Sequence, residues 1–214
     1  MEILAIILLA FAAYLIGCIS PSYYLTRYIK HIDIRTVGSR NAGTLNTFRE
    51  LGPWWALPVL LIDGGKGAIA VALPSLVGLP WWVVYVTASC VILGHNWPVL
   101  LKFRGGKGAA SLIGICLAFV PLVGMVAAIP GVITIFLSKN GIAGLVAGFA
   151  TLNILLMAAW IFDLTQLVPE ASWRQLLLCL PLTLFVGTIY GISIRGQLLE
   201  AIRRRSVKAA FYGS

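Results

Sequence analysis

Six apolar stretches, most of them close to 20 residues long, make up most of this chain. They cover residues 3–19, 53–79, 81–101, 109–137, 141–161 and 176–194. A helix needs roughly 20 apolar residues to cross a bilayer core of about 30 Å. Because 60% of the 214 residues are hydrophobic and 11% are charged, a disordered chain, a disulfide-stapled secreted domain and an ordinary cytosolic enzyme are excluded. We expect an all-α integral membrane protein, with residues 1–214 forming a single polytopic domain.

The stretch 109–137, with Pro121 and Pro130 inside it, decides the predicted topology. Read as one span, it places Asp163 and Glu170 inside and the arginine-rich tail outside. Two short helices of about 14 residues reverse these assignments, and the positive-inside rule favours that reading. We therefore predict about seven transmembrane helices, some short or broken, with the N-terminus outside and the C-terminus cytoplasmic. The cytoplasmic parts would be loops at about 30–52 and 101–108 and a basic tail over 195–214.

The formal net charge is +9, from 16 basic and 7 acidic residues. In a membrane protein a basic excess is first an orientation signal. Few aromatic residues accompany the basic runs, so nucleic acid is not an expected partner. The cysteines (Cys18, Cys90, Cys116 and Cys179) each lie alone in an apolar stretch. They are expected to be small packing residues, and no motif calls for a metal or another cofactor.

The segment 33–49 combines glycines, small polar side chains and arginines. Its glycines are Gly38 and Gly43, its hydrogen-bonding side chains are Ser39, Asn41, Thr44 and Asn46, and its cations include Arg40 and Arg49. A solvated loop that only anchors the topology is one interpretation. The concentration of glycine, asparagine and serine between two arginines favours a substrate-binding loop.

A second segment, 94–111, carries Lys107 among Gly105, Gly106 and Gly108. Glycines allow backbone N–H groups to approach an anion, and a helix starting near Ala109 would add its positive end. The pattern differs from a nucleotide P-loop because Gly108 follows the lysine. It indicates a phosphate-binding loop, with a tight turn between spans as the alternative.

A third segment places Asp63 and Lys66 within an apolar stretch, where charges must pair or face a cavity. At positions i and i+3 they can meet on one helix face. A structural ion pair and a wall of the active cavity are equally compatible with the sequence. The nearby His95 is either a general base or a hydrogen-bonding group at a helix end. Residues 64–68 and 105–109 share the sequence Gly-Gly-Lys-Gly-Ala.

These segments resemble the acyl-phosphate-dependent glycerol-3-phosphate acyltransferases of bacteria, the PlsY family. The resemblance rests on Asp-Ile-Arg-x-Val-Gly-Ser-x-Asn-x-Gly at 33–43, Asp-x-x-Lys-Gly at 63–67, Gly-His-x-x-Pro-Val at 94–99 and Lys-Phe-Arg-Gly-Gly-Lys-Gly at 102–108. It implies seven spans in the inner membrane and a cytoplasmic active site. The implied reaction moves an acyl chain from acyl phosphate to the 1-hydroxyl of glycerol 3-phosphate, giving lysophosphatidic acid and phosphate.

Carried over by position, the resemblance implies a set of site residues. The implied catalytic residues are Ser39, Asn41, Arg49, His95 and Lys107. The predicted substrate-binding residues are Gly38, Arg40, Gly43, Asn46, Lys66, Lys102, Arg104, Gly105, Gly106 and Gly108. Either His95 or a substrate phosphate would take the hydroxyl proton. The expected partners are acyl phosphate, glycerol 3-phosphate and membrane lipid.

The chain departs from the family pattern in places. The family usually has Gly at Arg40 and Pro at Ala42, and Ala201 stands in the tail where Asn is expected. The alternatives are therefore a diverged homologue, either non-catalytic or with an altered acceptor, and a small-anion transporter, whose helices are also often broken by glycines.

Overall fold

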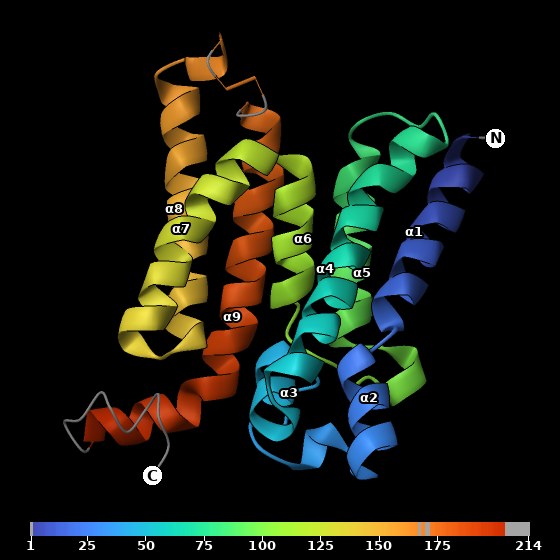
Figure 1. The fold of residues 1–214 in the computed structure, drawn as a ribbon. Helices are drawn as coiled ribbons and strands as arrows, with labels where there is room; N and C mark the ends of the chain where they lie inside the picture. Colours follow the sequence, from blue (N-terminus) through green and yellow to red (C-terminus); the bar gives the residue numbers. More distant parts are fainter. Residues whose placement is uncertain (1, 167, 170–171, 204–214) are drawn as a thin grey trace. The chain divides into compact units, whose positions relative to one another are not determined.

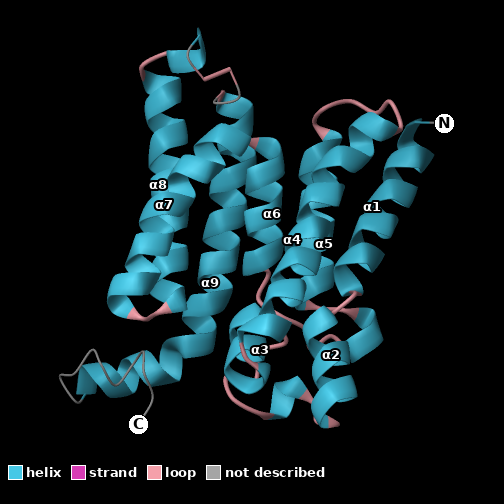
Figure 2. Cartoon of the chain, in the orientation of Figure 1, coloured by secondary structure: helices cyan, strands magenta, loops and turns pink. Residues whose placement is uncertain are grey.

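The computed structural model describes residues 2–166, 168–169 and 172–203, the last eight of these as helix backbone. Within this part of the chain every regular element is helical (Figure 2). Six of the described helical segments are long and apolar enough to cross a membrane, and Ala109–Phe119 is a shorter apolar helix. The predicted all-α membrane class is confirmed. The side on which each terminus lies stays a prediction, and the tail residues 204–214 lie outside the described part.

The chain divides into two compact units, Met1–Pro121 and Leu122–Ser214. The first unit contains α1 (Glu2–Cys18), α2 (Pro21–Lys30), η1 (Ile34–Thr36), α3 (Thr44–Leu51), α4 (Pro53–Leu76), α5 (Val83–Asn96), η2 (Val99–Leu101) and α6 (Ala109–Phe119). Here α1 packs on α5, and α4 packs on both α5 and α6 (Figure 1).

Glycines allow the membrane helices of the first unit to approach at backbone distance. A Cβ atom at Gly17 would overlap the carbonyl oxygen of Val91, and one at Gly67 would overlap that of Ser111. Small residues at such crossings are the usual means of packing transmembrane helices. The glycines around Lys66 therefore leave α4 continuous and bring α6 against it.

Two short helices of the first unit, α2 and α3, were not predicted. Pro21 occupies the first position of α2, where its missing N–H costs no hydrogen bond. Helix α3 ends at Gly52, which has φ +86° and leads directly into Pro53 of α4. The expected loop at 30–52 is thus partly helical, and this places Asn46 and Arg49 on a rigid element.

The stretch 109–137 forms two helices, as the charge distribution predicted. Their lengths differ from the expected 14 residues each: α6 has 11 residues and α7 (Pro121–Ser138) has 18. The break falls at Pro121, which cannot donate the hydrogen bond that would continue α6. Pro130 lies inside α7 without ending it.

The second unit consists of α7, α8 (Gly141–Ile161), η3 (Leu164–Gln166) and α9 (Trp173–Arg203). The Asn140 side chain caps α8 by accepting hydrogen bonds from the backbone N–H groups of Ile142, at 2.9 Å, and Ala143, at 3.2 Å. Asn153 joins α8 to α9 through Nδ2, which donates to Thr183 Oγ1 at 3.0 Å. These two asparagines satisfy backbone and side-chain polar groups within the unit.

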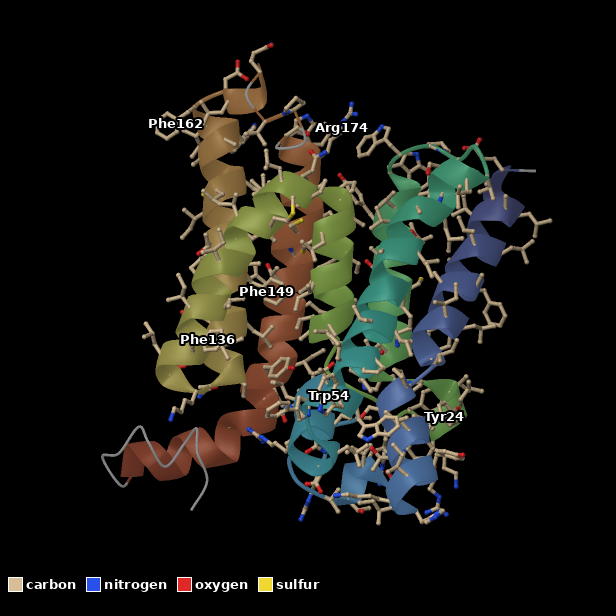
Figure 3. All side chains as sticks on the ribbon, in the orientation of Figure 1. Tyr24, Trp54, Phe136, Phe149, Phe162 and Arg174 are labelled. Atoms are coloured by element: carbon tan, nitrogen blue, oxygen red, sulfur yellow. The ribbon has the colours of Figure 1, made fainter. Side chains whose placement is uncertain are left out.

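Tryptophans mark the two ends of the helix pair α4 and α5. Trp54 is 84% exposed at the start of α4, beside α3 (Figure 3). Trp81 and Trp82 precede α5 at the opposite end and are more than two-fifths exposed. Tryptophan is enriched at membrane–water interfaces, so this placement agrees with a pair of spanning helices.

Candidate active site

Two connecting segments, 31–43 and 97–108, meet at one end of the first unit. Helices α1 and α5 end there, and α4 and α6 begin there (Figure 1). Arg35 joins the segments: its Nη1 donates to the carbonyl oxygens of Leu101, at 2.9 Å, and Arg104, at 3.2 Å. Its Nε and Nη2 groups donate to the Asp33 carboxylate at 2.6–3.1 Å. Hydrogen bonding to Arg35 lowers the pKa of Asp33.

Asn46 shapes the loop that carries Ser39. Its Oδ1 accepts a hydrogen bond from the Ser39 backbone N–H at 2.9 Å, and its Nδ2 donates to the carbonyls of Ile34 and Val37 at 3.0 and 3.1 Å. Its exposed fraction is 0%. Gly38, with φ +55°, lies so close that an added Cβ would overlap Asn46 Oδ1. This placement argues against the predicted substrate contact for Asn46 and makes it an internal brace.

The glycine loop at 105–108 lies against the end of α5. The Gly105 N–H donates to the carbonyl of Asn96 at 3.1 Å, and the Gly106 N–H donates to that of His95 at 2.9 Å. Two of the amides that were expected to approach an anion therefore have protein partners. Gly108 has φ +81° and caps α6 at its N-terminus. The first N–H groups of a helix have no intrahelical partner, so the start of α6 keeps the predicted anion-binding character.

Lys107 and Arg49 bring two positive charges together from distant parts of the sequence. Burial is the main cause that lowers the pKa of Lys107, and the charge of Arg49 lowers this pKa further. Arg49 lies in the last turn of α3 and is exposed. Two like charges held near a helix N-terminus form a site suited to an anion such as phosphate.

The remaining predicted site residues differ in their exposure. Ser39 and Arg40 are exposed, Asn41 is half-buried, and Arg40 adopts a left-handed backbone with φ +56°. Gly43 is buried at the N-cap of α3. Lys102 and Arg104 are exposed on the turn before the glycine loop. Their substrate contacts stay predictions.

Lys66 and His95 lie together below the loops, in a buried cluster with Asp63. Lys66 is 4% exposed, and its Nζ lies 2.6 Å from Asp63 Oδ1 and 3.2 Å from His95 Nδ1. The ion pair at positions i and i+3 is therefore present. Because protein atoms surround its ammonium, Lys66 is poorly placed for the predicted substrate contact.

Two residues outside the predicted site emerge from the geometry, namely Arg35 and Asp63. Arg35 appeared in the sequence only as part of a motif, because its loop-joining partners are backbone carbonyls with no sequence signal. Asp63 was recognised in the sequence as an intramembrane charge, either half of a structural ion pair or part of the wall of the active cavity. Among the described residues, no group of three or more His, Cys, Asp or Glu side chains could hold a metal ion.

Comparison with known proteins identifies the family. The sequence profile of the family described as glycerol-3-phosphate acyltransferase matches residues 7–199. The chain belongs to this family. All 15 predicted site residues of this family member fall in the first unit, within residues 38–108.

Relatives and solved structures agree with that assignment. A glycerol-3-phosphate acyltransferase of Thermoanaerobacter pseudethanolicus is 44% identical over 155 residues, which cover 72% of this chain and 77% of the relative. Glycerol-3-phosphate acyltransferase 2 of Dehalococcoides mccartyi is 35% identical and covers 97% of this chain and 98% of its own. Two crystal structures of PlsY (YgiH), an integral membrane glycerol 3-phosphate acyltransferase, have a similar fold. The glycerol 3-phosphate form matches with a TM-score of 0.78 at 24% sequence identity, and the lysophosphatidic acid form with a TM-score of 0.75 at 26%. Each match covers 92% of this chain and 93% of the other.

Proposed function

We propose that this chain transfers a fatty acyl group from acyl phosphate to the 1-hydroxyl of glycerol 3-phosphate, on the cytoplasmic side of a bacterial inner membrane. The observation that carries the proposal is the convergence of Arg49 and Lys107 beside the glycine loop and the start of α6. Both substrates present phosphate groups, for which this arrangement is suited. The family and the ligands of the PlsY structures support glycerol 3-phosphate as acceptor and lysophosphatidic acid as product.

The reaction is a displacement at an activated carbonyl. The acceptor hydroxyl oxygen forms a bond to the acyl carbon, and the bond from that carbon to the phosphate oxygen breaks. The electron pair leaves with the phosphate, and the hydroxyl proton passes to His95 or to a phosphate oxygen. Lys107 and Arg49 stabilise the charge that develops on the leaving phosphate, while Ser39 and Asn41 orient the acceptor or polarise the carbonyl.

Positioning two anions side by side accounts for much of the expected rate. An enzyme that holds two reactants in the correct geometry lowers the entropic part of the barrier. The Arg35 bridge between the loops and the Asn46 brace below Ser39 supply this rigidity. Acyl phosphate is already a mixed anhydride, so no covalent enzyme intermediate is required.

The test uses purified protein in lipid with palmitoyl phosphate and glycerol 3-phosphate, and it follows both phosphate release and lysophosphatidic acid. Lys107→Ala and Arg49→Ala should abolish product formation in folded protein. Lys139→Ala, a cation in the segment between α7 and α8, is the matched control and should retain activity. Full activity in the Lys107→Ala protein would contradict the assignment of Lys107 to the active site. Uptake of glycerol 3-phosphate into vesicles without acyl transfer would instead identify a transporter.

A further inference from the structure

A buried ionic cluster lies where α1, α4 and α5 meet. Lys66 donates hydrogen bonds from Nζ to the carbonyl oxygens of Ile19, at 2.7 Å, and Gly17, at 3.2 Å. These carbonyls belong to the end of α1, where helical carbonyl groups lack intrahelical donors and favour a positive charge. The Asp63 carboxylate, on the same face of α4, is the counter-ion at 2.6 Å. The ammonium thus joins α4 to the end of α1.

The same ammonium contacts His95. Nζ lies 3.2 Å from His95 Nδ1, closer than the Asp63 Oδ1 atom at 3.4 Å. A lysine ammonium has N–H donors and no acceptor, so a hydrogen bond between Nζ and Nδ1 requires Nδ1 to accept it. A neutral imidazole that accepts at Nδ1 carries its proton on Nε2.

The opposite side of the His95 ring lies against the glycine loop. A Cβ atom added to Gly106 would overlap His95 Nε2, and it would lie 2.8 Å from the carbonyl oxygen of Ala42. The Gly106 N–H donates to the His95 carbonyl at 2.9 Å. The ring and the backbone of His95 thus both contact the residue that precedes Lys107.

We infer that Asp63 and Lys66 are positioning residues of the acyltransfer, which act through His95 on the glycine loop. They hold His95 as the Nε2–H imidazole, and His95 holds Gly106 and hence Lys107 in place. In this form the ring offers a hydrogen-bond donor and has no lone pair on Nε2 with which to take the hydroxyl proton. Lys66 acts without touching substrate. The inference rests on the proposed function, although its first test below is independent of activity.

The first test reads the tautomer of His95 directly. The chain has two histidines, so His31→Gln leaves His95 as the single imidazole in ¹⁵N-histidine-labelled protein in lipid nanodiscs. The expected spectrum at neutral pH is that of the Nε2–H tautomer with Nδ1 as acceptor. An Nδ1–H tautomer or an imidazolium would overturn the inference. No substrate is needed, so this result stands whether or not the proposed reaction is found.

The second test separates positioning from folding. Removing one partner of a buried ion pair is strongly destabilising, whereas replacing both by apolar residues is often neutral. Asp63→Leu combined with Lys66→Met should therefore stay folded and be more stable than Lys66→Met alone, although it loses the donors to the Gly17 and Ile19 carbonyls. Loss of the Lys66 donor should give mixed His95 tautomers and lower kcat/KM by roughly tenfold to 100-fold. Parental kcat/KM in the folded double variant would overturn the inference.

A third variant perturbs His95 without touching the buried charges, in case the double variant does not fold. Gly106→Ala should displace the imidazole and lower kcat/KM, and it should also lower thermal stability because the added Cβ meets the Ala42 carbonyl oxygen at 2.8 Å. Gly65→Ala is the matched control, because a Cβ atom there meets nothing within 4 Å although it adjoins Lys66. It should keep full activity. Unchanged kcat/KM in Gly106→Ala would contradict the proposed link between His95 and the loop.

Discussion

Replacing Asn46 by aspartate tests whether the loop that carries Ser39 depends on one buried amide. The substitution keeps the side-chain shape and the acceptor for the Ser39 N–H. It removes the two N–H donors to the carbonyls of Ile34 and Val37, at 3.0 and 3.1 Å, and it turns a carboxylate towards those oxygens. A buried carbonyl that loses its donor costs about 1–3 kcal/mol. The Val37 carbonyl keeps a hydrogen bond from the Arg40 N–H at 3.0 Å, so the loss at Ile34 dominates. It predicts a decrease of about 1–3 kcal/mol in the free energy of unfolding.

The assay compares thermal unfolding and steady-state kinetics of Asn46→Asp in the same lipid. We expect kcat/KM to fall because Ser39 and its neighbours lose their fixed backbone. Lower pH should restore part of the stability, since a protonated carboxyl can donate one O–H to a carbonyl. Asn153→Asp is the matched control: its amide donates to Phe149 O and Thr183 Oγ1 in the second unit. It should lower stability without changing kcat/KM.

Two results would refute this reasoning about Asn46. Unchanged stability and activity would show that the loop holds its shape without the amide. A rise in KM for glycerol 3-phosphate, with stability and kcat unchanged, would restore the sequence-based prediction that Asn46 contacts substrate.

Two further predictions concern charged groups of the site. Burial first, and Arg49 second, lower the pKa of Lys107 from its ordinary value of 10.5. The unfolded chain therefore binds more protons between the lowered pKa and 10.5, and the free energy of unfolding should rise with pH across that window. Phosphate binding favours the charged lysine, so KM for glycerol 3-phosphate should rise as pH passes the lowered pKa. Lys107→Arg should abolish this dependence, and a pH profile identical in both proteins would exclude Lys107 as its source. Arg35→Lys should lower kcat/KM and thermal stability, because an ammonium cannot replace the guanidinium fork that reaches Asp33, Leu101 and Arg104 together. Wild-type kinetics in that variant would show that the loops need no bridge.

The long apolar helices and the common location of the two loops follow from the sequence because they depend on local quantities. Apolar length gives the spans, Pro121 gives the break between α6 and α7, and the glycines before Ala109 give the start of α6. The brace at Asn46 and the bridge at Arg35 have no such signal. Their partners are backbone atoms, and the carbonyls that Arg35 reaches lie 66 and 69 residues away. Only the folded structure shows which polar side chains already form hydrogen bonds within the protein and so are not available to bind substrate.

The repeated sequence Gly-Gly-Lys-Gly-Ala shows why local pattern alone does not assign a role. At 64–68 the residues lie inside α4, where Gly67 allows α6 to approach and Lys66 pairs with Asp63. At 105–109 the same letters follow a left-handed turn, and the glycines lie on His95 while Lys107 faces Arg49. The flanking residues make the difference. Asp63 supplies a counter-ion for Lys66 on the same helix face. Lys107 instead precedes the start of α6, and the N-terminus of a helix favours an anion such as phosphate. The surroundings of each lysine, rather than its glycine context, therefore determine which of the two is suited to bind substrate.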